Sequence, residues 1–350
     1  MKAWRVILQV LGVNPMRTTR TYLAALFIGL CLFLPLSVDA NRDYIKVATF
    51  NIAELGEGTR PEARDELAIA GMLVNLDLDL IAIQEVATKE RGQSQIQLMT
   101  SQMNGLLGPD ACHYNCLTSA FQTGDERYAF IWRSPVAITS GPKRMGDRDE
   151  YKGSLFVRTP VYCSFNARDF DFVLMNVHLY TRIEKTPTKG RKFEYQQIVK
   201  WLKYQVENGS EKDYLIVGDW NRFLDGSSYP RTSAWSTLTY AGFENNFRLV
   251  LLEALPGKEY DIRHAPTDEW STTQASRRSM YDLILISAGA FREFGMVEGE
   301  LDARFGENVG IEAFDNWPQY KGMSYQTLKY VISDHRPVWA KFKIDLRDDD

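Results

Sequence analysis

From residue 41 onward the chain alternates short apolar runs with amphipathic helical segments, and this alternation restricts the fold more than any other feature. Apolar residues spaced three or four apart predict helices over 61–76, 96–107 and 193–207. Runs rich in β-branched and aromatic residues predict strands at 44–52, 80–84, 128–132, 154–165, 170–178, 214–217, 282–287 and 338–344. No internal repeat, low-complexity linker or shift in composition interrupts the pattern. We therefore expect one compact α/β domain, with two packed sheets and helices outside them.

The composition is that of an ordinary globular protein. The chain has 350 residues, of which 45% are hydrophobic and 25% charged. A chain of this length can bury a large core, so its fold should not depend on disulfides or structural metals. Four cysteines over 350 residues exclude a disulfide scaffold, and no CxxC pair of the zinc-binding type occurs.

The first forty residues have the pattern of a targeting segment. Residues 21–38 carry no charge. Arg17 and Arg20 precede this segment, and Pro35 interrupts its apolar run. Val38 and Ala40 are small residues at the positions that a signal peptidase reads, so we expect a signal peptide over 1–40 and a secreted or periplasmic protein. The alternative is an uncleaved membrane anchor, but the run is short for a hydrocarbon core about 30 Å thick.

Cleavage there would leave a catalytic domain over 41–345 and an acidic tail over 346–350. Loss of four basic residues and one acid leaves 37 basic and 44 acidic residues, a net charge of −7. An acidic protein can still bind a polyanion through clustered cations. In an oxidising compartment Cys112 and Cys116 could close a small disulfide, with Cys163 buried in a strand; the alternative is three free thiols.

Polar residues recur where the predicted strands end. A lone aspartate after a strand is usually a turn or helix cap, and a lone buried histidine is usually a core residue. Six such positions in series instead indicate a rigid scaffold that directs polar groups into one cleft. They are Asn51 in FNI, Glu85 in IQE, His178 in NVHL, Asp219 and Asn221 in GDWN, Asp282 in YDLILIS, and Asp334 and His335 in ISDH.

This series, in this order, resembles the endonuclease/exonuclease/phosphatase superfamily over 44–344, with SDHRPV and GDWN the most specific parts. GDERYAFIWR around Glu126 and VRTPV around Arg158 are similar to the secreted, deoxyribonuclease I-like branch. Trp220 inside GDWN departs from the usual Phe or Leu, which concerns packing only. The resemblance implies a four-layered α/β/β/α sandwich of two mostly antiparallel sheets, and a divalent-metal-dependent phosphodiester hydrolase acting as an endonuclease.

The resemblance also implies a cation site at Asn51, Glu85 and Asp334. Carboxylates and amides suit hard, oxygen-seeking cations, so we expect magnesium or manganese, with calcium possible. A bound cation would polarise a phosphate oxygen and stabilise charge on the leaving oxygen.

Two carboxylate–imidazole pairs are implied as catalytic groups, in which each carboxylate orients its imidazole. They are Glu126 with His178 and Asp282 with His335; which imidazole is acid and which is base is left open. Asp219 would orient or activate water. Arg158 and Asn221 are the implied phosphate-binding residues.

A basic stretch follows His178 and could track a polynucleotide backbone, which suggests nucleic acid, DNA first, as the substrate; the alternative is an ordinary solvated loop. It contains Arg182, Lys185, Lys189, Arg191 and Lys192, and Arg277 and Arg278 precede Asp282. Arg127 and Tyr128 are further candidates for a nucleic-acid contact, although Tyr128 fits the core better. We expect no stable membrane association after signal cleavage; the oligomeric state is left open.

Two alternatives differ in class. A phospholipase C or sphingomyelinase-type phosphodiesterase shares the motifs but needs an exposed apolar docking loop, and none is evident. Inositol-phosphate phosphatases are disfavoured because Ser279, Met280, Tyr281 and Asp282 stand where they carry Trp–Cys–Asp–Arg. A non-catalytic binding protein on the same fold would lack a catalytic group, and none is missing.

Overall fold

The computed structural model describes residues 42–56, 64–88, 90–109, 111–121, 124–146, 156–181, 190–221, 247–249, 281–297, 300–301, 308–348 and 350. The elements below belong to one compact unit formed by residues 39–107 and 112–350. The predicted signal peptide over 1–40 lies outside the described residues. No helix among the described residues is long and apolar enough to span a membrane.

The first sheet has strand order β13-β14-β1-β2-β4-β3. Its two central strands, β1 (Tyr44–Leu55) and β2 (Leu80–Ala87), run parallel, and its other described pairs are antiparallel. The remaining strands are β3 (Asn115–Thr118), β4 (Glu126–Trp132), β13 (Val309–Ile311) and β14 (Val338–Lys343).

The second sheet has order β5-β6-β7-β8-β10-β9 and repeats the plan of the first. Its central strands β7 (Phe170–His178) and β8 (Tyr214–Asp219) run parallel, and its other described pairs are antiparallel. The others are β5 (Val136–Arg144), β6 (Val161–Ala167), β9 (Phe247–Leu249) and β10 (Asp282–Ser287); β11 (Met296–Val297) pairs separately with β12 (Glu300–Leu301).

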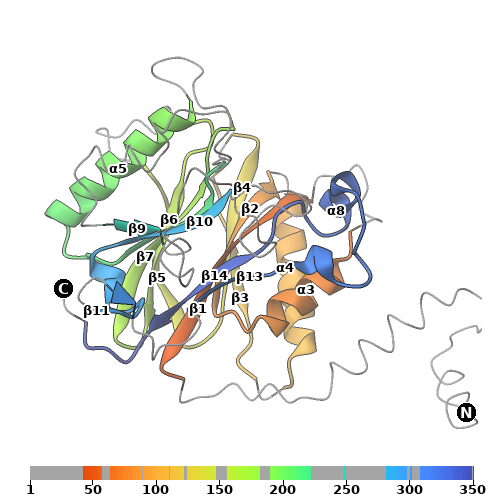
Figure 1. Cartoon of the computed structure of the whole chain (residues 1–350), viewed down its shortest axis with the longest axis horizontal. Coiled ribbons are helices and arrows are strands. Elements are labelled where there is room, and N and C mark those ends of the chain that lie inside the picture. The colour runs from red at the N-terminus through yellow and green to blue at the C-terminus, as the bar shows by residue number, and fades with distance from the viewer. Residues whose placement is uncertain are drawn as a thin grey trace, which may run out of the picture. The chain divides into compact units, whose positions relative to one another are not determined.

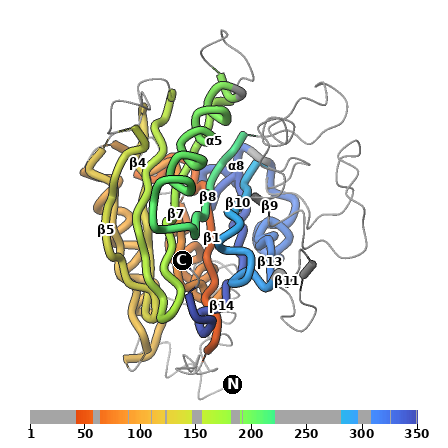
Figure 2. The backbone as a smooth tube through the Cα atoms, turned by 90° about the vertical axis from the view of Figure 1, so that its left-hand side faces the viewer, coloured from red at the N-terminus to blue at the C-terminus, as the bar shows by residue number. Residues whose placement is uncertain are grey.

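Helices cover the outer faces of the two sheets (Figure 1). α3 (Glu66–Asn75) and α4 (Glu90–Leu106) pack together on the first sheet, and α5 (Arg191–Asn208) runs along β7 and β8 of the second (Figure 2). A shorter helix, α8 (Tyr325–Val331), precedes the ISDH motif. Two mostly antiparallel sheets between helical layers confirm the four-layered α/β/β/α sandwich.

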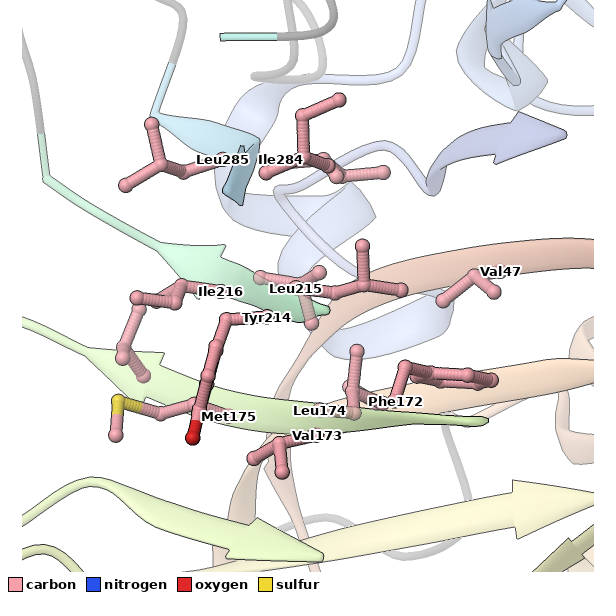
Figure 3. Packing of buried hydrophobic residues seen from close by; sticks show 14 of the residues in the cluster. Val47, Phe172, Val173, Leu174, Met175, Tyr214, Leu215, Ile216, Ile284 and Leu285 are labelled. Atoms are coloured by element: carbon pink, nitrogen blue, oxygen red, sulfur yellow. The ribbon is translucent and has the colours of Figure 1, made fainter. Parts of the chain in front are cut away.

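The core forms because both faces of the central strands are covered. On β7 and β8, Leu174 and Leu215 point toward Val47 of the first sheet, while Tyr214 lies on the opposite side (Figure 3). The ring of Tyr214 packs edge-on against Trp201 of α5 at 5.8 Å. Strands covered on both faces are apolar throughout, which is why the runs at 170–178 and 282–287 were predicted with their observed bounds.

Three sequence expectations differ from the structure. The first helix starts at Glu66, because the Asp65 side chain accepts the Ala68 N–H at 3.0 Å and caps it there. The strand expected from 154 begins at Val161, and β5, which contains a glycine and a proline, was not predicted. The thiols of Cys112, Cys116 and Cys163 are free, and Cys163 is buried in β6 as predicted. Cys116 lies in β3, and Cys112 lies before that strand.

Candidate active site

Strand pairing brings the predicted polar residues to one end of the sandwich. In the parallel pair β7–β8, His178 lies opposite Asp219, and in the antiparallel pair β8–β10, Asp219 lies opposite Asp282. In the facing sheet, Asn51 of β1 pairs with Gln84, the residue before Glu85. Residues far apart in the chain therefore meet because the ends of β7 and β8 and the start of β10 lie at the same edge.

Gly218 permits the close approach of β7 and β8 at this edge. Its φ is +144°, and a Cβ built there would lie 1.9 Å from the carbonyl oxygen of Val177. No side chain fits at that distance, so a glycine is required before Asp219. The glycine of the GDWN motif thus has a structural reason.

The first predicted pair, Glu126 and His178, is formed. Nδ1 of His178 lies 3.0 and 2.9 Å from the two carboxylate oxygens of Glu126, and both residues are buried. A carboxylate only accepts, so Nδ1 carries a proton and Nε2 faces the site. Burial lowers the pKa of His178, but attraction by Glu126 and Asp219 outweighs it and raises that pKa to about 9. Burial raises the pKa of Glu126.

The second predicted pair, Asp282 and His335, is formed in the same way. Nδ1 of His335 lies 2.8 Å from Oδ2 of Asp282, and both residues are buried. Burial lowers the pKa of His335, but attraction by Asp282 and Asp219 outweighs it and raises that pKa well above its usual value. Tyr281 packs its ring 5.9 Å from the imidazole.

Asp219 lies between the two pairs. Its Oδ2 is 3.5 Å from Nε2 of His178 and 3.7 Å from Nε2 of His335, and it accepts a hydrogen bond from Nδ2 of Asn51 at 3.0 Å. Its Oδ1 accepts the backbone N–H of Asn221 at 2.7 Å. The carboxylate is therefore fixed where it can exchange protons with two imidazoles, or with a water between them.

Glu85 reaches the site through a β-bulge. Pairing of β2 shifts register around it, and its φ of +58° is in the left-handed region, which is uncommon for a non-glycine residue. Its Oε1 accepts from Nδ2 of Asn51 at 2.9 Å and lies 3.9 Å from Nε2 of His178. Strained backbone of this kind is found at functional sites.

The donor atoms present fit a hard divalent cation. Donor atoms of Glu85, His178 and Asp219 lie within 4.8 Å of one another, as do those of Asp219, Asp282 and His335. Carboxylate oxygens dominate both groups, and the side chain of Glu85 keeps 21% exposure, so that the cluster stays accessible. Neither group contains Asp334.

Asp334 lies next to this cluster in the chain and is buried. Oγ of Ser333 donates to the carbonyl oxygen of Asn51 at 2.7 Å and accepts the backbone N–H of His335 at 3.0 Å, which ties the 333–335 turn to the end of β1. The charge of Asp334 contributes to the raised pKa of Lys329, after the hydrogen bond from Lys329 to Glu54. A role of Asp334 as a metal ligand stays a prediction.

The two predicted phosphate-binding residues make contacts within the protein. Nε of Arg158 lies 2.9 Å from Oε2 of Glu126, so its charge neutralises the carboxylate that holds His178. Nδ2 of Asn221 donates to the carbonyl oxygen of Leu179 at 2.7 Å. Both contacts hold neighbouring site residues in place, and phosphate binding by either residue stays a prediction.

Several positioning residues were not predicted from the sequence. Glu194 of α5, which is 1% exposed, accepts the backbone N–H groups of Val157 at 2.9 Å and Tyr180 at 2.7 Å. It thereby joins the segment before Arg158 to the segment after His178. Between the sheets, Nε2 of Gln84 donates to Oδ1 of Asn176 at 2.7 Å. The sequence signal for Gln84 and Asn176 was an amide residue inside a largely apolar strand.

Two of the candidate nucleic-acid contacts, Tyr128 and Arg191, are buried. Tyr128 is fully buried, and its hydroxyl oxygen accepts the backbone N–H of His178 at 2.9 Å, so it belongs to the core as expected. Arg191 is 4% exposed and donates to the carbonyl oxygen of Thr181 at 3.2 Å. It is therefore not an exposed phosphate contact. Residues 182–189 and 277–278 lie outside the described residues.

Two mixed sheets between helical layers, with two carboxylate–imidazole pairs around one aspartate, define a hydrolase with a phosphoesterase fold. The chain belongs to the Endonuclease/Exonuclease/phosphatase family, whose model matches residues 48–335. Members of this family are metal-dependent phosphoesterases or nucleases.

Solved structures agree on the fold. The crystal structure of truncated Caenorhabditis elegans TDP2 has 14% identity and a TM-score of 0.50, covering 86% of this chain and 97% of that one. An endonuclease/exonuclease/phosphatase family protein from Bacteroides thetaiotaomicron has 15% identity and a TM-score of 0.51, covering 87% and 98%. An endonuclease/exonuclease/phosphatase family protein from Leptotrichia buccalis has 13% identity and a TM-score of 0.50, covering 86% of this chain and 100% of that one. None of the curated proteins matches the chain.

Proposed function

We propose that the protein is a secreted, metal-dependent phosphodiesterase that hydrolyses DNA by in-line attack of an activated water. The position of Asp219 carries this proposal, because its Oδ2 lies 3.5 Å from one imidazole Nε2 and 3.7 Å from the other. Hydrolysis of a phosphodiester needs a proton taken from water and charge stabilised on a leaving oxygen. Asp219 can take the proton from water, and an oriented imidazolium beside it can give a proton to the leaving oxygen.

The chain's own groups divide this work. Glu126 and Asp282 hold the two imidazoles with Nε2 toward the substrate, and each carboxylate stabilises the imidazolium form. Asp219 orients the attacking water and accepts its proton. Burial raises the pKa of Glu126, and the guanidinium of Arg158 together with His178 opposes that rise.

Glu85 and Asn51, which lie beside Asp219, would hold magnesium or manganese, which when bound polarises a phosphate oxygen and stabilises charge on the leaving oxygen. Asn51 donates to both carboxylates and so keeps their oxygens close together. Asp334, which lies in the 333–335 turn tied to Asn51, is the further proposed ligand.

DNA is proposed as the substrate on two grounds. The segments around Glu126 and Arg158 resemble secreted deoxyribonucleases, and the basic stretch from Arg182 to Lys189 follows the strand that ends in His178. Cations there would offset the repulsion between a polyanion and a chain whose net charge becomes −7 once residues 1–40 are removed. The signal-like segment over 1–40 supports secretion.

A substrate panel tests the proposal. Duplex DNA, single-stranded DNA, RNA, sphingomyelin and inositol phosphates are offered to the protein with EDTA, and then with excess magnesium or manganese. We expect duplex DNA to be cut fastest, with activity lost in EDTA and restored by either metal. Full activity after exhaustive chelation would refute the metal-dependent mechanism, and a preference for sphingomyelin would refute the nuclease assignment alone. Glu85→Gln should abolish metal-restored activity on every substrate.

A further inference from the structure

A second group of carboxylates lies at the other end of the same central strands. Asp171 is at the start of β7, and Glu211 and Asp213 precede β8, whereas His178 and Asp219 are at the ends of those strands. Six residues separate Asp213 from Asp219, about 20 Å along an extended strand. The segment after β14 passes this end, where the C-terminus lies beside the second sheet (Figures 1 and 2). It adds Asp348 and Asp350 to the group.

These five carboxylates come from three separate segments and lie close together. Donor oxygens of Glu211, Asp213 and Asp350 are within 4.8 Å of one another, and so are those of Asp171, Asp348 and Asp350. Asp350 thus belongs to both sets. Its side chain accepts the backbone N–H of Lys212, which holds the tail segment against the loop before β8.

Asp213 brings to this group a buried carboxylate oxygen that has no hydrogen-bond partner among the described residues. It is 2% exposed, and within the described part of the chain its Oδ1 has no hydrogen-bond partner. The ammonium of the adjacent Lys212 donates instead to the carbonyl oxygens of Val206 at 2.5 Å and Gly209 at 2.6 Å. A buried carboxylate without a compensating cation or hydrogen bond is strongly destabilising.

Burial and mutual repulsion disfavour ionisation of these carboxyls. Burial raises the pKa of Asp213 to about 9, and the nearby charges of Glu293 and Glu211 add to the rise. Burial raises the pKa of Glu211 to about 8, with Asp350 and Asp171 contributing, although the backbone N–H of Asp213 opposes this by hydrogen bonding. Near neutral pH these two carboxyls therefore hold their protons in the absence of a cation, and a cation that binds there must displace them.

We propose that Glu211 and Asp213, with Asp171, Asp348 and Asp350, bind one calcium ion that fastens the tail segment to the start of β8. Calcium accepts six to eight oxygen ligands in flexible geometry, which suits carboxylates from three segments. Magnesium requires stricter octahedral geometry and keeps more of its waters, so it fits this group less well. This site is separate from the cation site proposed for catalysis and does not depend on it.

Calcium binding to the full-length protein, freed of metal by chelation, tests this site. Calorimetric titration should give one more calcium ion per chain for the wild type than for Asp213→Asn, and calcium should raise the melting temperature of the wild type only. Glu85→Gln should keep this ion, because Glu85 is at the opposite end. Asp169→Asn is the matched control: its carboxylate is exposed, two residues from Asp171, and outside the group, so calcium binding should be unchanged.

A second variant keeps the test independent of folding effects at Asp213. Asp348→Asn changes a partly exposed residue of the tail and should weaken calcium binding at least about tenfold. The proposal is overturned if Asp213→Asn binds as many calcium ions as the wild type. It is also overturned if calcium leaves the melting temperature of the wild type unchanged while acidification from pH 8 to 6 raises it, because a proton would then be the counter-charge.

Discussion

Replacing Glu126 by glutamine tests whether the charge of this carboxylate raises the pKa of His178. The substitution keeps the shape of the side chain but removes the charge that lies 2.9 Å from Nδ1 of His178. A glutamine amide can also present its NH₂ group to Nδ1, which would allow the other imidazole tautomer. Both effects weaken the imidazolium form of His178, while Asp219 and Arg158 stay in place.

The size of the effect follows from the pKa of His178. Attraction by Glu126 and Asp219 outweighs burial and raises this pKa from 6.5 to about 9. Removing one opposite charge at hydrogen-bond distance typically shifts a pKa by about 1–3 units, which equals about 1.4–4 kcal/mol. We expect the pKa of His178 to fall by that amount, and kcat to fall between about 10²- and 10⁴-fold.

The same shift predicts how stability changes with pH. Because folding raises the pKa of His178, the stabilisation is fully present below pH 6.5 and is lost as the pH rises through about 9. Between pH 6 and 9.5 the unfolding free energy of the wild type should therefore fall by about 3 kcal/mol through this group. The fall should be smaller in Glu126→Gln.

NMR titration of the imidazole and urea unfolding, both in chelator, measure these quantities. Asp125→Asn is the matched control, since Asp125 is the neighbouring carboxylate, its side chain is 83% exposed, and it lies 3.6 Å from Arg158. It should change stability by less than about 0.5 kcal/mol. A His178 pKa that stays within about half a unit of the wild type would refute the assigned cause. A kcat within tenfold of the wild type would refute the positioning role of Glu126.

Three further predictions follow from the site. His178→Ala and His335→Ala should each lower kcat at least about 100-fold with an unchanged circular dichroism spectrum, and near-native turnover would remove that histidine from the mechanism. Gly218→Ala should destabilise the fold by about 2 kcal/mol or more and abolish activity, because its Cβ would meet a carbonyl oxygen of β7 at 1.9 Å. Gly105→Ala in α4, where a Cβ meets nothing within 4 Å, should instead stabilise it by up to about 1 kcal/mol. Each cation that contacts a phosphate adds about 0.9 to the slope of log DNA affinity against log salt concentration. Replacing Arg182, Lys185 and Lys189 together by alanine should therefore flatten that slope and raise KM for DNA. An unchanged slope and KM would make that loop ordinary solvated surface.

Local patterns were enough to predict the layers of the sandwich and most of its central strands. The runs at 170–178 and 282–287 have their predicted bounds because burial on both faces makes such strands continuously apolar. β5 was missed because an exposed strand with Gly141 and Pro142 has neither continuous apolarity nor clean alternation. Bulges are equally hard to predict, so the backbone distortion that turns Glu85 into the site was not predicted, although Glu85 itself was.

The sequence by itself determined the kinds of groups in the site and their order along the chain, because most of them lie directly before or after a recognisable apolar run. Only the tertiary structure decided which groups meet. Asp219 lies between two histidines that are 157 positions apart in the chain, and that geometry depends on strand register and on the close approach at Gly218. Likewise, the carboxylates around Asp213 come from three segments with no shared motif. Their proximity is a property of sheet pairing, which local periodicity does not specify.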